Sequence, residues 1–164
     1  MRLKRKLIKL FRPKWPLPEY DPEIQPHFLF VVTPPYSGST ALTRLLNTGQ
    51  RTTLLHRRGE GQWLIPGLSQ KDRWDPEKKV NYESVRAVWL HEYQRLRRAD
   101  NRAEVVIEKS PPNMVRLEEL SSLFRYRSFL ANNRNPYANC ASMLYRHYDA
   151  QAIGMKERMR ILRR

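Results

Sequence analysis

Phe28-Leu-Phe-Val-Val-Thr-Pro-Pro-Tyr-Ser-Gly-Ser-Thr-Ala-Leu-Thr-Arg-Leu-Leu46 is the stretch around which the rest of the chain is organised. Residues 28–32 are apolar and rich in β-branched and aromatic types, which predicts a buried strand. A turn signal follows at residues 33–38, and Ser39 or Thr40 can cap a helix after it. The apolar residues expected on one face of that helix are Ala41, Leu42, Leu45 and Leu46.

A strand, a turn of small residues and a helix together predict a candidate anion site. The first N–H groups of a helix lack intrahelical acceptors, and the positive end of the helix dipole lies beside them. Gly38 allows the backbone to approach an anion closely, and the hydroxyls of Ser37, Ser39 and Thr40 add hydrogen-bond donors. Taken alone, the same stretch also fits an ordinary strand-to-helix turn.

Length and composition indicate one domain in a reducing compartment. A chain of 164 residues suffices for a single domain with a core. Its single cysteine, Cys140, excludes an internal disulfide framework and a multi-cysteine zinc site, so we expect no metal and a buried, apolar role for this residue. We find no membrane span or signal peptide in the sequence, and we expect a cytoplasmic protein.

The strong positive charge lies mostly at the two ends of the chain. Of the net charge of +15, residues 1–14 contribute +7 and residues 154–164 contribute +4. Basic tails of this kind contact nucleic acid or anionic membrane surfaces, although many are simply solvated. The apolar residues of the N-terminal arm make peripheral membrane contact an open alternative.

The remaining chain alternates strands with helices. We expect strands at 51–55, 104–108 and 128–131, a long connection at 57–81, and helices at 82–98, after Asn113 and from Asn135–Pro136 to about 149. The helix after Asn113 is expected to carry Met114, Leu117, Leu120 and Phe124 on one side. This alternation predicts an α/β fold of three layers, α/β/α, around a central, mostly parallel sheet.

Polar groups follow three of the expected strands. Residues 33–40, 108–110 and 132–134 each come directly after a strand, and the carboxyl ends of parallel strands meet at one edge. A hydroxyl-rich turn, Lys109 and Arg134 at that edge suit a phosphate or sulfate ligand.

Three of these segments resemble the PAPS-dependent sulfotransferases. Pro35-Tyr-Ser-Gly-Ser-Thr40 is similar to the family's 5′-phosphosulfate loop, Pro-(Lys/Arg)-Ser-Gly-Thr-Thr, and is not a Walker A motif. Arg134 and Ser142, eight residues apart, match the pair that binds the 3′-phosphate, and Glu108-Lys-Ser-Pro111 matches a further family segment. The resemblance implies a P-loop-NTPase-like sulfotransferase architecture at 28–150, incomplete at its C-terminus, between a basic, proline-rich arm (1–27) and a basic tail (151–164).

The resemblance also implies a reaction and its residues. PAPS is the expected co-substrate, and a sulfuryl group passes to a hydroxyl or amine of an unknown acceptor, a carbohydrate being one candidate. The implied nucleotide-binding residues are Tyr36, Ser37, Gly38, Ser39, Thr40, Arg134 and Ser142. The implied catalytic residues are Lys109 and Glu60, with His56 as the alternative base. Trp63 and Trp74 are candidates for lining an acceptor cleft or for the core.

Two alternatives stay open at this point. Tyr36 stands where the family has a cation, and the chain ends at Arg164 without the family's closing segment, which favours a catalytically silent nucleotide-binding remnant. The charge of +15 favours a nucleic-acid-binding protein, but no nucleic-acid-binding motif supports it.

Overall fold

The computed structural model describes residues 21–65, 67–100 and 102–147. Most of the basic arm predicted at 1–27 and the whole of the tail predicted at 151–164 lie outside the described residues. The predicted domain boundaries therefore stay predictions. No helix within the described ranges is long and apolar enough to cross a membrane.

A four-stranded, all-parallel sheet forms the centre of the fold. Its strands are β1 (His27–Val32), β2 (Thr52–Leu54), β3 (Val105–Glu108) and β4 (Arg127–Ala131). They lie in the order β2-β3-β1-β4, with Phe30 of β1 paired to Glu108 of β3 and to Phe129 of β4. The predicted strands and their parallel arrangement are confirmed.

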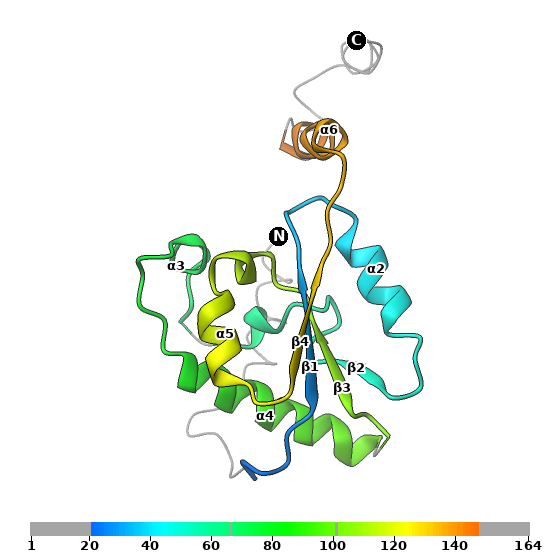
Figure 1. Cartoon of the computed structure of the whole chain (residues 1–164), viewed down its shortest axis with the longest axis vertical. Helices are drawn as coiled ribbons and strands as arrows, with labels where there is room; N and C mark the ends of the chain where they lie inside the picture. Colours follow the sequence, from blue (N-terminus) through cyan, green and yellow to red (C-terminus); the bar gives the residue numbers. More distant parts are fainter. Residues whose placement is uncertain (1–20, 66, 101, 148–164) are drawn as a thin grey trace, which may run out of the picture.

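Helices lie on both faces of this sheet. Figure 1 shows α2 (Ser39–Leu46) on one side, and α3 (Gln70–Trp74), α4 (Tyr82–Ala99) and α5 (Leu117–Leu123) on the other. The 3₁₀ helices η1 (Gly61–Leu64) and η2 (Pro111–Val115) occupy the connections after β2 and β3. The α/β class is thus confirmed, and the arrangement is consistent with three layers.

Aromatic side chains make the core between the sheet and α4. Phe28 and Phe30 alternate with residues of the other face of β1, and both rings pack against Trp89 and Phe124, with centroids 4.3–6.3 Å apart. Tyr93 of α4 is also buried, and its hydroxyl donates to the carbonyl of Ala103 at 2.9 Å. Burial of several large rings supplies most of the hydrophobic stabilisation here.

The predicted cap of α2 is wrong, and the face of α2 that is buried is not its apolar face. Gly38 occupies the N-cap with φ +87°, and neither Ser39 nor Thr40 caps the helix through its side chain. The buried residues of α2 are Ser39 and Thr43, whereas Leu45 is 68% exposed. A left-handed glycine turns the chain sharply into the helix, which places the hydroxyl face of α2 toward the sheet.

Three further predictions are corrected. Asn113 and Met114 lie inside η2, so Asn113 does not cap the next helix. Of the residues expected on one side of that helix, Leu120 and Phe124 are buried, whereas Met114 and Leu117 are exposed. Cys140 is exposed instead of buried. The connection at 57–81 is long, as predicted, but it contains the short helices η1 and α3.

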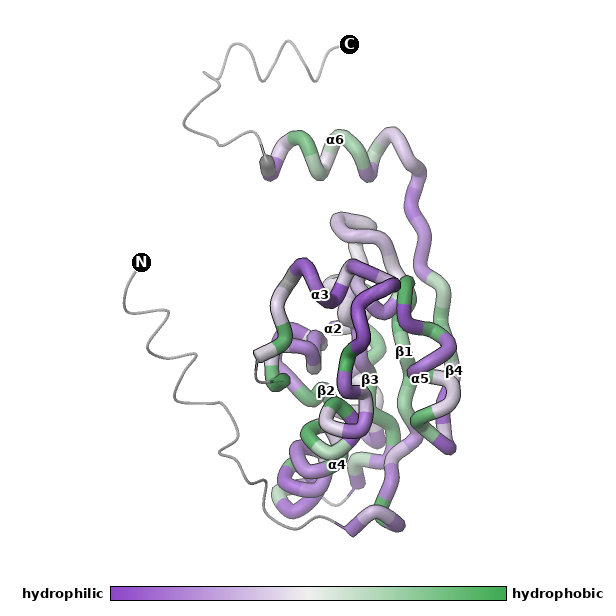
Figure 2. The backbone as a smooth tube through the Cα atoms, turned by 90° about the vertical axis from the view of Figure 1, so that its left-hand side faces the viewer, coloured by the Kyte–Doolittle hydropathy of each residue, from purple (hydrophilic) through white to green (hydrophobic). Residues whose placement is uncertain are grey.

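The last described helix stands apart from the layers. Helix α6 (Pro136–His147) begins as predicted, with the Asn135 side chain accepting from the N–H of Ala138 at 3.2 Å. Figure 2 shows α6 beyond the end of the sheet, joined to β4 by an extended segment. Its predicted end near residue 149 lies outside the described residues.

Candidate active site at the carboxyl ends of the strands

The ends of β1 and β4 are joined by a cluster of hydroxyl and amide groups. The Asn132 side-chain amide donates to the hydroxyls of Thr33 and Ser37, each at 2.9 Å, and those two hydroxyls also contact each other. Thr33 and Ser37 are buried. These bonds fix the start of the loop 34–40, which follows the central strand β1 at the point where the connections leave for opposite faces of the sheet.

The loop itself uses two left-handed residues. Tyr36 has φ +64° and Gly38 has φ +87°, and the N–H of Ala41 bonds back to the carbonyl of Gly38 at 2.9 Å. This geometry directs the first turn of α2 toward the strand ends, where its N–H groups can meet an anion. Space is open around Gly38, because a Cβ placed there meets no atom within 4 Å.

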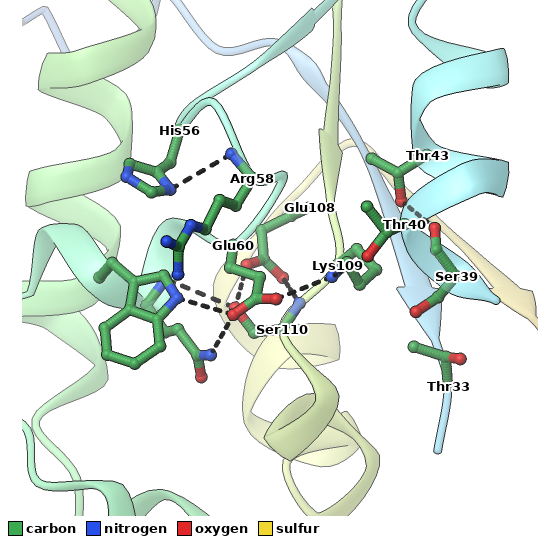
Figure 3. A network of polar contacts seen from close by, with 12 residues as sticks. Thr33, Ser39, Thr40, Thr43, His56, Arg58, Glu60, Glu108, Lys109 and Ser110 are labelled. Carbon is green, nitrogen blue, oxygen red and sulfur yellow. Dashed lines mark hydrogen bonds and ion pairs between the residues drawn. The ribbon is translucent and has the colours of Figure 1, made fainter. Parts of the chain in front are cut away.

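Lys109 and Glu60, the two predicted catalytic residues, form an ion pair. Lys109 Nζ lies 2.8 Å from Glu60 Oε1 and 3.5 Å from Thr40 Oγ1, and the lysine side chain is only 3% exposed. Figure 3 shows Lys109 between Glu60 and the hydroxyl of Thr40. A cation from the end of β3 therefore contacts both the predicted base and the start of α2.

Glu60 is held by donors on both of its oxygens. Trp63 Nε1 and Gln62 Nε2 donate to its Oε2 at 2.7 and 3.0 Å. Burial works against ionisation of this carboxyl, but the hydrogen bond and charge of Lys109 outweigh it and lower the pKa of Glu60 from 4.5. The side chain is therefore a carboxylate at neutral pH and not the solvated loop residue that a single glutamate often is.

A second carboxyl group, that of Glu108, supports the pair from inside the protein. Glu108 is fully buried and accepts hydrogen bonds from the backbone N–H groups of Gly61 (2.9 Å) and Ser110 (3.1 Å), and from the side chains of Ser110 and Asn113. Burial raises its pKa above 4.5, and the four hydrogen bonds oppose that rise. Glu108 thus connects the Glu60 loop to the end of β3.

From the sequence, Glu108 is expected only as part of the family-like segment 108–111, with no role of its own. Lys109 forms its ion pair with Glu60, and Glu108 instead holds the Glu60 loop and the end of β3 together through its hydrogen bonds. The available signal was an acidic residue that directly continues the apolar run Val105–Ile107, since a buried acid is rare unless it is paired or bonded.

Gly59 allows the Glu60 loop to approach the rest of the site. Its φ is +72°, and its carbonyl accepts the N–H of Lys109 at 2.7 Å. A Cβ at this position would lie 2.7 Å from Thr43 Cγ2, so a side chain here would push the loop away from α2. The glycine and Glu108 together hold the Glu60 loop against β3.

The predicted phosphate pair, Arg134 and Ser142, is also in contact. Arg134 Nη1 donates to Ser142 Oγ at 2.9 Å and to the carbonyl of Tyr36 at 3.1 Å. Ser142 in turn donates to the carbonyl of Ala138 at 2.9 Å. Arg134 is exposed, in contrast to Lys109.

His56, the alternative base, lies at the side of this network. Its Nδ1 accepts the N–H of Arg58 at 3.4 Å (Figure 3). Burial lowers the pKa of His56 from 6.5, and the neighbouring charges of Arg57 and Arg58 lower it further. Residues 21–65, 67–100 and 102–147 contain no group of three or more His, Cys, Asp or Glu side chains that could hold a metal ion.

The site therefore combines a turn suited to an anion, a buried lysine, a carboxylate and an exposed arginine at one edge of the sheet. Comparison with protein-family models, with curated proteins and with solved structures finds no match to this chain.

Proposed function

We propose that this protein is a sulfotransferase of P-loop-like architecture that binds PAPS and transfers its sulfuryl group to a hydroxyl or amine acceptor. The contact of Arg134 with both Ser142 and the carbonyl of Tyr36 carries this proposal. The residues expected at the 3′-phosphate and the loop expected at the 5′-phosphosulfate are thereby adjacent. A nucleotide with phosphates on both the 3′ and 5′ positions is the ligand that such a pair of sites fits.

The cation of Lys109 and the carboxylate of Glu60, at the end of β3 and in the loop beside it, suit an in-line transfer. The acceptor oxygen forms a bond to sulfur while the bond from sulfur to the 5′-phosphate oxygen breaks and leaves its electron pair on that phosphate. The positive charge of Lys109 stabilises the negative charge that develops on the sulfuryl and phosphate oxygens during the transfer. The Glu60 carboxylate, which its lowered pKa keeps ionised, accepts the proton of the acceptor hydroxyl.

A silent nucleotide-binding protein is the second candidate, and Tyr36 favours it. Tyr36 supplies no charge to the loop where the sulfotransferases carry Lys or Arg. The guanidinium of Arg146 on α6 lies 5.8 Å from the Tyr36 ring centroid, which makes it a candidate for the missing cation. Both candidate functions predict that the protein binds the nucleotide, but only the sulfotransferase predicts turnover.

Calorimetric titration of the full chain tests the nucleotide site. Adenosine 3′,5′-bisphosphate and 5′-AMP differ only in the 3′-phosphate, so they are matched ligands. We expect the bisphosphate to bind at least about tenfold more tightly, because Arg134 and Ser142 contact the additional phosphate. Equal affinities would refute the 3′-phosphate site and with it the proposed function.

Transfer of ³⁵S from labelled PAPS to a mixture of glycans and small hydroxyl compounds then separates the two candidates. Labelled product supports the enzyme. Tight bisphosphate binding with no product supports the silent form, and Tyr36→Lys should then restore transfer if the missing cation is the cause.

A further inference from the structure

A small cavity lies between the connection that follows β2, the first half of α4 and η2. It has a volume of about 20 Å³, measured as room for the centre of a water molecule. Its polar lining comes from Gln62, Arg73, Tyr82, Trp89, Asn113 and Arg116. A space of about 10–15 Å³ by this measure already holds one water, so the cavity admits one small polar group.

Two buried arginines line this cavity, and their hydrogen bonding differs sharply. Arg116 is 3% exposed, and its terminal nitrogens reach the carbonyls of Asp72, Asp75 and Pro76 and the carboxylate of Glu119. Arg73 is 6% exposed, and its Nε and Nη1 have no acceptor among the described residues. The Trp63 ring faces its guanidinium at 4.8 Å, but an aromatic ring does not replace a hydrogen-bond acceptor.

The cavity as a whole has more free donors than free acceptors. Within the described part of the chain, Trp89 Nε1 and Arg116 Nε are buried without an acceptor, like the two nitrogens of Arg73, and Gln62 Oε1 is an acceptor of the lining without a donor. A buried charge without a partner is costly, and buried polar groups are normally bonded. An anionic oxygen in the cavity would satisfy several of these donors at once.

Two side chains, those of Gln62 and Trp63, link this cavity to the candidate base Glu60. Gln62 lines the cavity, and its Nε2 donates to Glu60 Oε2 at 3.0 Å. Trp63 contacts Arg73 through its ring and donates from Nε1 to the same carboxylate oxygen at 2.7 Å. Gln62 and Trp63 therefore link the Arg73 cavity to the Glu60 carboxylate, so a ligand group in the cavity lies one side chain away from the candidate base.

We propose that the Arg73 cavity binds a carboxylate group of the acceptor and so selects an acidic acceptor. The part of this proposal that concerns an acceptor rests on the proposed sulfuryl transfer. A flat carboxylate has two small oxygens for the free donors, and it suits the limited space better than a tetrahedral sulfate or phosphate. The exposed Arg57 and Arg58 precede Glu60 in the same loop and add positive charge to it.

The test compares two sugars that differ in one group. Methyl β-D-glucuronide carries a carboxylate where methyl β-D-glucoside carries a hydroxymethyl group. In the full chain, followed by NMR of the arginine Nε–H groups, we expect the glucuronide to shift the Arg73 signal and to bind at least about tenfold more tightly than the glucoside. Equal binding of the two sugars, or an unmoved Arg73 signal, would overturn the proposal.

Substitution of Arg73 provides the second arm. Arg73→Met should reduce glucuronide affinity at least about tenfold, and Arg73→Lys should reduce it less. Arg102→Met is the matched control, because Arg102 precedes β3 and lies at the opposite end of that strand. Unchanged affinity in Arg73→Met would count against the site, and if that variant does not fold, the wild-type comparison of the two sugars still decides.

Failure of this inference can be told apart from failure of the proposed function. Binding of adenosine 3′,5′-bisphosphate is measured on the same samples, and Arg73→Met should leave it within about twofold. A protein that binds the bisphosphate but does not prefer the glucuronide keeps the proposed function and loses the acceptor site. A protein that binds the glucuronide through Arg73 but not the bisphosphate keeps the carboxylate site alone.

Discussion

The two halves of the candidate site are built in opposite ways. At the end of β3, Lys109 and Glu108 are buried, and six hydrogen bonds hold the carboxyl groups of Glu108 and Glu60. Lys109 bonds to Glu60 and to Thr40. At the end of β4, Arg134 is exposed and lies next to α6, which extends beyond the sheet (Figures 1 and 2). The first half is part of the core, and the second half lies on its edge.

This difference in burial implies different roles for the two halves of the site. Groups that are buried and fully bonded are already positioned before a ligand arrives, which is what transition-state stabilisation requires. An exposed arginine is ordered mainly by its ligand, so its contribution is to affinity. Variants in the β3 half should therefore change turnover or stability, and variants in the β4 half should change binding alone.

The largest expected effect is that of Glu60→Gln on turnover. Loss of a general base reduces rates by about 10²–10⁴-fold, while glutamine keeps an oxygen that can accept from Lys109. The measurement is the kcat of ³⁵S transfer, with bisphosphate affinity as the test of a preserved site. Glu104→Gln removes a carboxylate from an exposed ion pair with Arg51 at the other end of β3, and it should leave kcat unchanged. A kcat for Glu60→Gln within threefold of the wild type would eliminate Glu60 as the base.

The pH dependence distinguishes Glu60 from His56. Because the pKa of Glu60 is lowered from 4.5, its carboxylate persists down to that pH, and kcat/KM should decline only below about pH 4.5. The contribution of this ion pair to the free energy of unfolding changes with pH in the same direction. It is fully present above pH 4.5 and is lost as the pH falls through the lowered pKa of Glu60. If His56 were the base, the decline would instead follow protonation of its imidazole, whose pKa burial lowers from 6.5.

The next largest effect is that of Glu108→Gln on stability. The side-chain amide would present an NH₂ group to the donors of Gly61, Ser110 or Asn113, and a buried donor without an acceptor costs about 1–3 kcal/mol. We expect the free energy of unfolding to fall by about 3 kcal/mol, measured by urea denaturation. Glu104→Gln again provides the control, with a change below about 1 kcal/mol. A similarly small change for Glu108→Gln would mean that the four hydrogen bonds do not hold the Glu60 loop.

Sequence patterns were sufficient for the parts of the fold that local periodicity determines. The strands at β1, β3 and β4 and the long helix α4 follow from runs of apolar residues and from helical spacing. The buried face of α2 could not be predicted in this way, because Gly38 turns the helix so that Thr43, and not Leu45, faces inward. Likewise, the exposure of Cys140 depends on where α6 lies, which its own sequence does not determine.

The candidate site was predictable where parallel strands alone bring residues together. Lys109 and Arg134 follow directly from strand ends, so the topology places them near the loop 34–40. Contacts made by side chains across loops were not predictable. The partner of Lys109, the buried bonding of Glu108 and the unsatisfied guanidinium of Arg73 all depend on how the connection at 57–81 folds back onto β3.

A moderate effect is expected when the exposed half is altered. Arg134→Gln removes a charged donor to the proposed 3′-phosphate, so the affinity for adenosine 3′,5′-bisphosphate should fall about 10–100-fold. The free energy of unfolding should change by less than about 0.5 kcal/mol, because the side chain is exposed. Calorimetry and urea denaturation measure the two quantities, and Arg102→Gln is the control. A large loss of stability with unchanged affinity would reverse the distinction between the two halves.

The smallest expected effect concerns the loop between the halves. Tyr36 holds φ +64°, and a left-handed backbone costs a residue with a side chain about 1–2 kcal/mol, whereas asparagine adopts it more readily. Tyr36→Asn should therefore stabilise the fold by about 0.5–1 kcal/mol relative to Tyr36→Ala, which loses the ring but retains the strain. The carbonyl of residue 36 still accepts from Arg134 in both variants, so bisphosphate affinity should differ little between them. If alanine proves as stable as asparagine, the left-handed turn is unstrained, and the loop owes its shape to the Thr33–Ser37–Asn132 cluster alone.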